Sequence, residues 1–252
     1  MRLLLLGGTR EAAALAAACV EAGHHPLTSL AGRTREPRPV MGEVRTGGFG
    51  GAEGLAAFLR EGGFDALVDA THPFAAAISA NAARAAAEAG TPRVALVRPA
   101  WAPERGDDWR HVPDLETAAT ALPRGAHALL ALGRQHLAPF LARADVRFTA
   151  RMIEASDMPL PGIAIVRARP SADPDKEAGF LRARGITHLV SRNAGGPGAY
   201  AKIAAARMLG LPVVMVARPP APPPPHAGSV GAVMAWLASS RPSSHPPSCP
   251  RS

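Results

Sequence analysis

Cysteine is nearly absent from this chain, which has two among its 252 residues, Cys19 and Cys249. Two cysteines so far apart form neither the disulfide framework of a small secreted domain nor the closely spaced pairs of a zinc site. We therefore expect no metal site. The low cysteine content also fits the reducing cytoplasm.

Aromatic residues and long apolar runs are scarce as well. Aromatics make up 4% of the chain, so we expect no stacking platform for single-stranded nucleic acid. No stretch reaches the ~18 apolar residues of a membrane-spanning helix. The run Leu3–Leu6 is shorter than the roughly 7–15 apolar residues of a secretory signal, and Gly7 and Gly8 end it at once. The sequence predicts a cytoplasmic protein with no membrane, nucleic-acid or obligate protein partner.

The charge balance is basic, at +8 from 28 Lys+Arg and 20 Asp+Glu, and nearly all the cations are arginines spread along the chain. Such a balance suits nucleic acid, or a small polyanion held by bidentate guanidinium contacts. A composition that simply favours arginine over lysine accounts for it equally well. Charge alone therefore does not decide between these alternatives.

Short apolar segments alternate with alanine-rich segments, which is the pattern of an α/β fold with parallel sheets. In the first half we predict strands at 3–6, 25–32, 65–70 and 93–99, and helices at 12–22, 51–64 and 73–90. In the second half we predict strands at 126–133, 146–152, 162–170, 186–192 and 211–219, and helices at 134–143, 173–185, 198–210 and 229–239.

The polar segment 100–114 interrupts this alternation and has no periodic apolar face. We therefore expect two Rossmann-like domains with the active site in the cleft between them. The predicted parts are an N-terminal domain at 1–98, a crossing at 99–113, a C-terminal domain at 114–239 and a disordered tail at 240–252. Ligands bind such sheets at the carboxyl ends of their strands, so the residues that follow each strand matter most.

The first such turn is Gly7-Gly8-Thr9-Arg10. Two glycines let a backbone approach a pyrophosphate, and Thr9 can cap the following helix or donate to a phosphate. Arg33, after the second predicted strand, can accommodate the 2′-phosphate of NADP. The alternatives are a plain strand-to-helix turn for the glycines and a solvated surface side chain for Arg33.

The turn after the strand at 65–70 carries Thr71, His72 and Pro73, with Pro73 predicted in the first turn of a helix. His72 at a strand end can face the ligand as an acid or base, although a capping or surface role is the commoner use of such a histidine. In the second half the corresponding positions again carry glycines and arginines at the starts of predicted helices, which favours anion binding. They are Gly133, Arg134, Arg192, Asn193, Gly195 and Gly196.

Several motifs in order resemble the precorrin-6A reductase family of cobalamin biosynthesis. They are "LLLLGGTREAAALA", "DATHPFAAAIS", "RPAW" and "SRNAGGPGAYAKIAAARMLGLPVVMVARP", and they extend the resemblance from Arg2 to about Ser239. The resemblance implies NADPH-dependent reduction of one double bond of precorrin-6A, or of its cobalt form, to precorrin-6B by hydride transfer to a ring carbon.

The resemblance also implies roles for residues. Gly7, Gly8 and Thr9 would hold the cofactor, and the loop with His72 would lie beside the nicotinamide and the macrocycle. The loop with Asn193 would belong to the ligand face of the second domain. The carboxylates of this anionic tetrapyrrole would meet arginines, which would account for the basic balance. These are Arg33, Arg98, Arg134, Arg151 and Arg192.

Two further questions stay open in the sequence. The proton for the neighbouring ring carbon comes either from His72 or from solvent. A non-catalytic NADP-binding redox regulator, or an NADPH reductase of another polycarboxylate, would share the first half of the chain. The second glycine-rich, arginine-bearing face favours a reductase of a large anion, because a sensor has no need of it.

Overall fold

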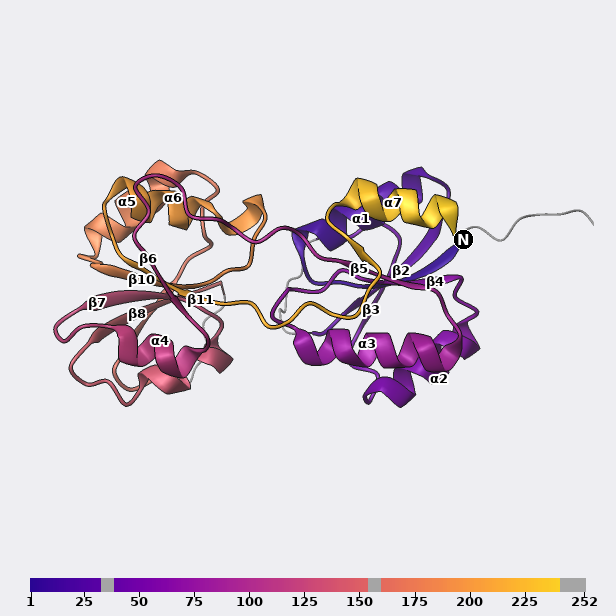
Figure 1. Ribbon diagram of the computed structural model, residues 1–252, viewed down its shortest axis with the longest axis horizontal. Helices are drawn as coiled ribbons and strands as arrows, with labels where there is room; N and C mark the ends of the chain where they lie inside the picture. Colours follow the sequence, from indigo (N-terminus) through magenta and orange to yellow (C-terminus); the bar gives the residue numbers. More distant parts are fainter. Residues whose placement is uncertain (33–38, 154–159, 241–252) are drawn as a thin grey trace, which may run out of the picture. The chain divides into compact units, whose positions relative to one another are not determined.

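The computed structural model describes residues 1–32, 39–153 and 160–240. The chain forms two compact units, one of Met1–Val97 together with the segment that begins at Pro222, and one of Arg98–Ala221. Each unit contains one six-stranded parallel sheet with helices on both faces (Figure 1). The predicted α/β class with two parallel sheets is confirmed.

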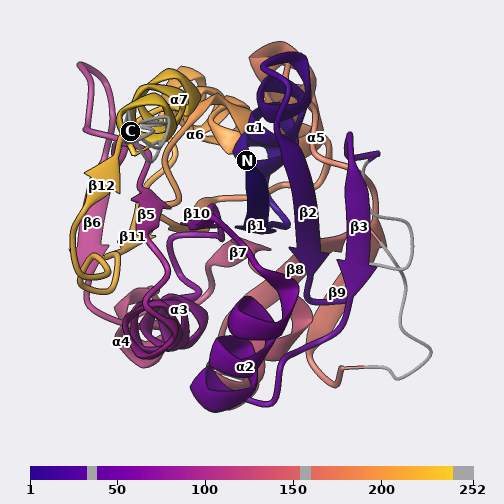
Figure 2. The same ribbon diagram turned by 90° about the vertical axis from the view of Figure 1, so that its right-hand side faces the viewer.

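The first unit has the strand order β3-β2-β1-β4-β5-β12, with β3 and β12 at opposite edges (Figure 2). Leu3 and Leu5 of β1 pack in the cluster with α1 and α7, while Leu4 and Leu6 pack in the cluster with α2 and α3, so both faces of β1 are buried. The elements are β1 (Arg2–Leu6), α1 (Arg10–Glu21), β2 (His25–Leu30), β3 (Glu43–Thr46), α2 (Ala52–Gly62), β4 (Ala66–Asp69), α3 (Ala76–Ala89), β5 (Arg93–Leu96), β12 (His226–Ala227) and α7 (Val230–Ser239).

The second unit has the strand order β9-β8-β7-β10-β11-β6. Its α elements are α4 (Leu115–Ala121), α5 (Pro174–Ala183) and α6 (Ala201–Met208), with short 3₁₀ turns η1 (Arg134–His136), η2 (Ala138–Phe140) and η3 (Pro197–Ala199). Its strands are β6 (Trp109–Val112), β7 (His127–Ala131), β8 (Arg147–Met152), β9 (Ile163–Arg167), β10 (His188–Arg192) and β11 (Val213–Val216).

The first sheet has the Rossmann order 3-2-1-4-5-6 when its strands are counted along the chain, and the second sheet has the same order when β6, which comes first in the chain, is counted last. The sixth strands, however, are exchanged along the chain. The strand β6, which follows the first five strands of the first sheet, completes the second sheet, and β12, which follows the second set, completes the first. The strand order reverses between β1 and β4 in the first sheet and between β7 and β10 in the second, which is where Rossmann sheets bind ligands.

The unit boundaries differ from those that we predicted. The predicted C-terminal domain at 114–239 includes α7, but Val233 and Leu237 of this helix are fully buried in the core of the first unit. The predicted crossing at 99–113 contains β6 and belongs to the second unit. Arg207 of α6 fixes this segment through hydrogen bonds to Asp107 (3.0 Å) and Glu104 (2.8 Å). The predicted tail from 241 onward lies outside the described residues.

Two local predictions were also wrong, and the edge strand β3 was not predicted. The helix predicted at 134–143 is replaced by η1 and η2, because Pro139 lacks an N–H and its ring would clash with a carbonyl in the preceding turn. The edge strand β3 was missed because its residues are mostly exposed and polar. The helix α3 begins at Ala76, so Pro73 lies in the preceding turn and not in the first helical turn.

Candidate active site

The turn after β1 is built around two glycines and a capping threonine. A Cβ at Gly7 would lie 2.7 Å from Thr28 Cγ2 of the neighbouring strand, so only glycine fits there. Gly8 adopts a left-handed φ of 102°, which other residues rarely adopt. The Thr9 hydroxyl accepts a hydrogen bond from Ala12 N (3.0 Å) and thereby caps α1. The predicted capping role of Thr9 is the one that the structure shows.

Backbone donors remain at this turn. Within the described part of the chain, the N–H groups of Gly8, Thr9 and Arg10 have no hydrogen-bond acceptor. They lie at the N-terminus of α1, where the helix dipole adds a partial positive charge, and Arg10 is exposed beside them. Glu11, in the same helical turn, opposes this charge. The turn is suited to bind a phosphate through its backbone.

The turn after β4 lies directly beside the turn after β1. The Thr9 hydroxyl donates to Ala70 O (2.9 Å), so it is not available to donate to a phosphate. The Asp69 carboxylate accepts from both the backbone N–H (3.1 Å) and the hydroxyl (2.7 Å) of Thr71. Asp69 is 3% exposed, and its Oδ2 has no hydrogen-bond partner among the described residues. Two of the predicted loops therefore meet at one edge of the sheet.

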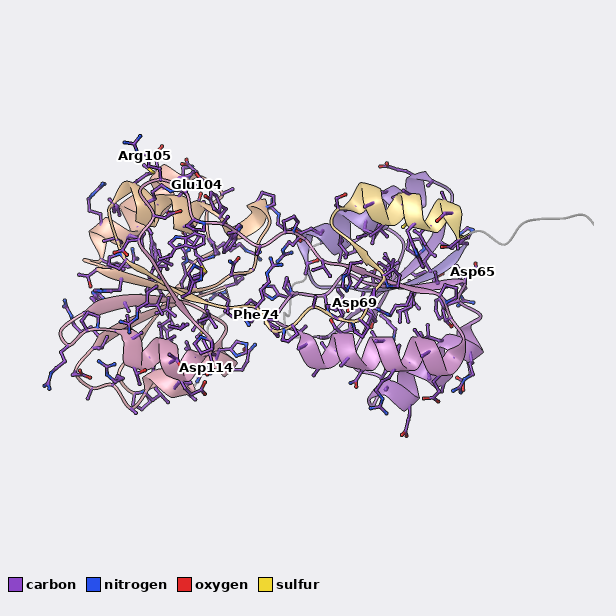
Figure 3. The ribbon with its side chains drawn as sticks, in the orientation of Figure 1. Asp65, Asp69, Phe74, Glu104, Arg105 and Asp114 are labelled. Carbon is purple, nitrogen blue, oxygen red and sulfur yellow. The ribbon has the colours of Figure 1, made fainter. Side chains whose placement is uncertain are left out.

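His72 has a defined tautomer in this turn. The Phe74 backbone N–H donates to His72 Nδ1 at 3.2 Å, so the neutral ring carries its proton on Nε2. Asp69 and Phe74, which lie on either side of the Thr71-His72 pair in the chain, are labelled in Figure 3. The ring is partly exposed at the carboxyl end of β4. Its position and tautomer allow it to donate a hydrogen bond through Nε2.

In the second unit, the loops after β7 and β10 also lie together. Arg192 Nη1 donates to His136 Nε2 at 3.1 Å, which joins the two loops. Gly133 and Arg134 therefore share an edge of the sheet with Arg192, as we predicted from their strand-end positions. This edge is the point where the strand order of the second sheet reverses.

The glycine loop after β10 is held by its carbonyl groups. Three side chains bind three of its carbonyl oxygens: Arg218 binds Asn193 (2.7 Å), Arg98 binds Ala194 (2.8 Å) and Trp101 binds Gly196 (2.8 Å). Within the described residues, no acceptor faces the N–H groups of Gly195 and Gly196. These fixed N–H groups, close to Arg192 in the chain, can bind an anion without rearranging.

Glycine is required in this loop as it is in the first. Gly195 has a φ of 66°, and a Cβ there would lie 2.1 Å from both Arg218 Nη2 and Pro99 O. The Asn193 side chain is hydrogen-bonded within the protein. Its Oδ1 accepts from Trp101 N (2.8 Å) and its Nδ2 donates to Trp101 O (2.9 Å). Asn193 therefore shapes the loop, because both ends of its side-chain amide are bonded to the backbone of Trp101.

Arg151 does not act as a substrate-facing cation in this structure. Its guanidinium forms two hydrogen bonds with the Glu177 carboxylate, at 3.0 and 2.6 Å, and both side chains are almost fully buried. Glu177, on α5, could not be paired with Arg151 from the sequence, since nothing local connects them. We therefore exclude Arg151 from the proposed substrate ligands.

Three other residues of the second edge were not singled out in the sequence analysis. Trp101 and Arg218 come from segments on either side of the loop and fix its backbone, and neither has a glycine next to it in the chain. Lys202 is buried in the first turn of α6, where the alanine-rich pattern gave no indication of a buried charge. Arg33 lies outside the described residues.

The described residues contain no cluster of three or more His, Cys, Asp or Glu side chains suited to a metal ion. In the part of the chain that the structure describes, no helix is long and apolar enough to cross a membrane. The site residues fall into two sets. Gly7, Gly8, Thr9, Arg10, Thr71, His72 and Pro73 lie in the first unit, and Arg98, Gly133, Arg134, Arg192, Asn193, Gly195 and Gly196 lie in the second.

Comparison with known proteins gives consistent matches. The family described as "Precorrin-6x reductase CbiJ/CobK" matches residues 2–238. A "Precorrin-6A reductase" of Rhodobacter capsulatus is 43% identical over 240 residues, covering 94% of this chain and 96% of the relative. A protein of the same name from Rhodococcus erythropolis is 45% identical over 241 residues, covering 94% and 97%.

A more distant relative and a solved structure extend the comparison. A "Cobalt-precorrin-6A reductase" of Priestia megaterium is 31% identical over 231 residues, covering 86% of this chain and 90% of the relative. The solved structure titled "CobK precorrin-6A reductase" superposes with a TM-score of 0.92 at 43% identity, covering 95% of this chain and 97% of that one.

Proposed function

This chain belongs to the precorrin-6x reductase family, and we propose that it reduces one double bond of precorrin-6A to give precorrin-6B, with NADPH as the hydride donor. The observation that carries the proposal is 43–45% identity to precorrin-6A reductases over 94% of the chain. The cobalt-precorrin-6A reductase is more distant, at 31% identity, so we propose the metal-free substrate first.

The residues of the first unit fit a dinucleotide. The close packing at Gly7 brings the backbone to the sheet edge, and the N–H groups of Gly8, Thr9 and Arg10 are available for a pyrophosphate. When bound there, NADPH supplies a hydride to a ring carbon of the macrocycle. Arg33 remains our candidate for the 2′-phosphate contact that distinguishes NADPH from NADH.

His72 is our candidate for the proton donor. Asp69 orders its turn through Thr71, which holds Nε2–H at the strand end. Only the imidazolium is a strong enough acid, so a proton on Nδ1 must replace the hydrogen bond that Nδ1 accepts from Phe74 N before His72 can act. A general acid contributes roughly 10²- to 10⁴-fold to a rate. We therefore expect His72→Gln to lower kcat by about this factor with little change in KM. An unchanged kcat would assign the proton to solvent.

The second unit supplies partners for the substrate carboxylates. Arg134 and Arg192 can each bind a carboxylate in a bidentate manner, and Gly195 and Gly196 offer backbone N–H groups beside them. Because the loop carbonyls are already held, these donors are ordered before substrate binds. We place the reaction in the cytoplasm, which the low cysteine content of the sequence supports.

The decisive experiment mixes the purified protein with NADPH and enzymatically made precorrin-6A without oxygen. The absorbance of the reduced nicotinamide and the mass of the corrinoid are followed together. Loss of NADPH matched by a gain of two hydrogens in the corrinoid would establish the reductase.

Two controls make this experiment specific. NADH in place of NADPH tests the cofactor, and cobalt-precorrin-6A in place of precorrin-6A tests the substrate form. NADPH binding without turnover of either substrate would overturn the proposal and favour a redox regulator or another polycarboxylate substrate.

A further inference from the structure

Lys202 is a buried cation that the proposed reaction does not use. It lies in the first turn of α6 and is 8% exposed. Its ammonium donates to Ala199 O at 2.9 Å, and Nζ lies 5.0 Å from the ring centroid of Trp101. The described residues provide no other hydrogen-bond partner, so two of its three N–H donors are unused. A charge buried with so few partners normally destabilises a fold.

The groups around Lys202 make this burial more costly. The pKa of Lys202 is lowered to about 7, mainly by burial; the charges of Arg151 and Arg192 act in the same direction, and the charge of Glu177 opposes them. The Glu177 carboxylate is already occupied, because it accepts from Arg151 and from Ser171 N (2.7 Å). A charged lysine at this position therefore does not stabilise the fold, and its presence calls for a functional explanation.

The two contacts of Lys202 lie on the parts of the protein that hold the glycine loop. Trp101 binds this loop at Gly196 O and at the Asn193 side chain. Ala199 belongs to η3, the turn that connects the loop to α6. An ammonium over the face of an indole is attracted by its ring quadrupole, and this attraction disappears when the amine is neutral. The proton on Lys202 therefore acts directly on the supports of the loop.

We propose that Lys202 is a positioning residue of this reductase: its ammonium holds Trp101 and the η3 turn, and so keeps the 192–196 loop in the shape that binds the substrate carboxylates. The identity of the bound substrate in this inference rests on the proposed function. The contact between Lys202, Trp101 and the η3 turn does not. The charged groups facing Lys202 are Arg151 of β8, Glu177 of α5 and Arg192 of β10, with His136 of η1 bound to Arg192. Tyr200, two residues earlier, is bound to Glu104 and Arg207.

The chain has only two lysines, Lys176 and Lys202, so each can be followed separately by NMR in protein labelled at lysine. Lys176 is exposed on α5 and serves as the internal reference. We expect the Lys202 signal to titrate near pH 7, and the indole N–H signal of Trp101 to move with the same midpoint. In Lys202→Met the Trp101 signal should no longer change in this range. This readout requires no substrate.

Steady-state kinetics of precorrin-6A reduction test the consequence. In the wild type KM should rise as the pH passes about 7, with a smaller effect on kcat. Lys202→Met should raise KM about tenfold and make it independent of pH, the size expected for loss of a desolvated cation–π contact. Lys202→Arg keeps the charge and should keep a low KM at higher pH, while Lys176→Met should match the wild type.

The outcomes separate this inference from the proposed function. The inference would be overturned if folded Lys202→Met kept the KM values of the wild type across the pH range. It would also be overturned if the Trp101 signal did not change while Lys202 titrates. If KM lost its pH dependence in His136→Gln, with Lys202 intact, the pH dependence would be assigned to His136. This result would also overturn the inference. A wild type that reduces neither substrate overturns the proposed function, while a coupled titration of Lys202 and Trp101 would still support the contact.

Discussion

At the scale of single residues, Gly7 shows how closely the first loop approaches the sheet. We expect Gly7→Ala to destabilise the protein by about 1–3 kcal/mol, the usual cost of overpacking. The reason is that the new Cβ would lie 2.7 Å from Thr28 Cγ2 and 3.3 Å from Leu30 Cδ2. Denaturant unfolding measures the free energy. An unchanged midpoint would show that β2 can move aside.

Gly179 is the matched control for this substitution. It lies inside α5 with nothing within 4 Å of an added Cβ and with no left-handed φ. Gly179→Ala should therefore stabilise the protein by about 0.5–1 kcal/mol, because alanine loses less backbone entropy in a helix. Opposite signs for the two glycine substitutions are the expected result of the same unfolding assay.

Lys202 gives a prediction about pH and stability. Its folded pKa of about 7 lies below its ordinary value of 10.5, so the unfolded chain binds more protons between these limits. Stability from this group therefore increases as the pH rises from about 7 toward 10.5. Lys202→Met should be more stable than the wild type at pH 7 and below, and should lose this advantage as the pH rises. Thermal unfolding at several pH values checks the trend, and a variant less stable than the wild type at low pH would contradict it.

The sequence identified many single residues of the candidate site but not the partners that determine their roles. Gly7, Gly8 and Gly195 could be selected because a glycine soon after a strand indicates a close backbone approach or a left-handed φ. Arg151 was misjudged, because its partner Glu177 is brought to it only by the tertiary fold. A local pattern does not show that a charge is buried either, which is why the sequence analysis did not single out Lys202.

At the scale of elements, the Arg151–Glu177 pair connects β8 to α5. Glu177→Gln should destabilise the protein by about 3–5 kcal/mol, because it leaves a buried guanidinium without its counter-charge. Denaturant unfolding gives the free energy. A cost below about 1 kcal/mol would mean that water reaches the pair, as it does in surface ion pairs.

The double variant Arg151→Met with Glu177→Leu separates the pair from the packing around it. Removing both charges together removes their desolvation cost, so the double variant should be more stable than Glu177→Gln alone. A double variant as unstable as the single one would show that shape at this position matters more than charge.

Elements were predictable where their pattern is strong. Buried strands such as β1 and β10 were found from their apolar runs, and α2 and α5 from their alternation with strands. The strands β3 and β6 were missed, because an edge strand with exposed residues has no apolar run. The segment after β7, residues 134–143, was predicted as one helix, although Pro139 in the sequence already argues against a continuous helix.

At the scale of the whole molecule, the exchange of sixth strands predicts where a distant substitution acts. Leu237 of α7 is fully buried in the core of the first unit, although it follows the whole second unit in the chain. Leu237→Ala should cost about 2–5 kcal/mol. Hydrogen exchange should rise mainly in Met1–Val97 and much less in Arg98–Ala221.

Leu181→Ala is the matched control, since Leu181 of α5 is fully buried in the core of the second unit. Its effect on hydrogen exchange should be the reverse, with the increase concentrated in Arg98–Ala221. If both variants raised exchange equally throughout, the two units would unfold as one cooperative body and the localised response would be wrong.

The sheet class was predictable from the sequence, but the assignment of strands to sheets was not. Each half contains enough strands for its own sheet, and a simple tandem arrangement agrees equally well with every local signal. Only tertiary packing decides that β12 and α7 join the first sheet, through residues such as Val233 and Leu237.

The exchange also has a consequence for synthesis on the ribosome. Translation delivers β12 and α7 after the second unit, so the first sheet remains without its sixth strand until the whole second unit has been made. The second sheet receives all of its strands earlier, because β6 through β11 are translated before them. Domains usually complete folding in the order in which they are made. Here the unit that starts first is completed last, so a chain that stops early leaves its N-terminal core open.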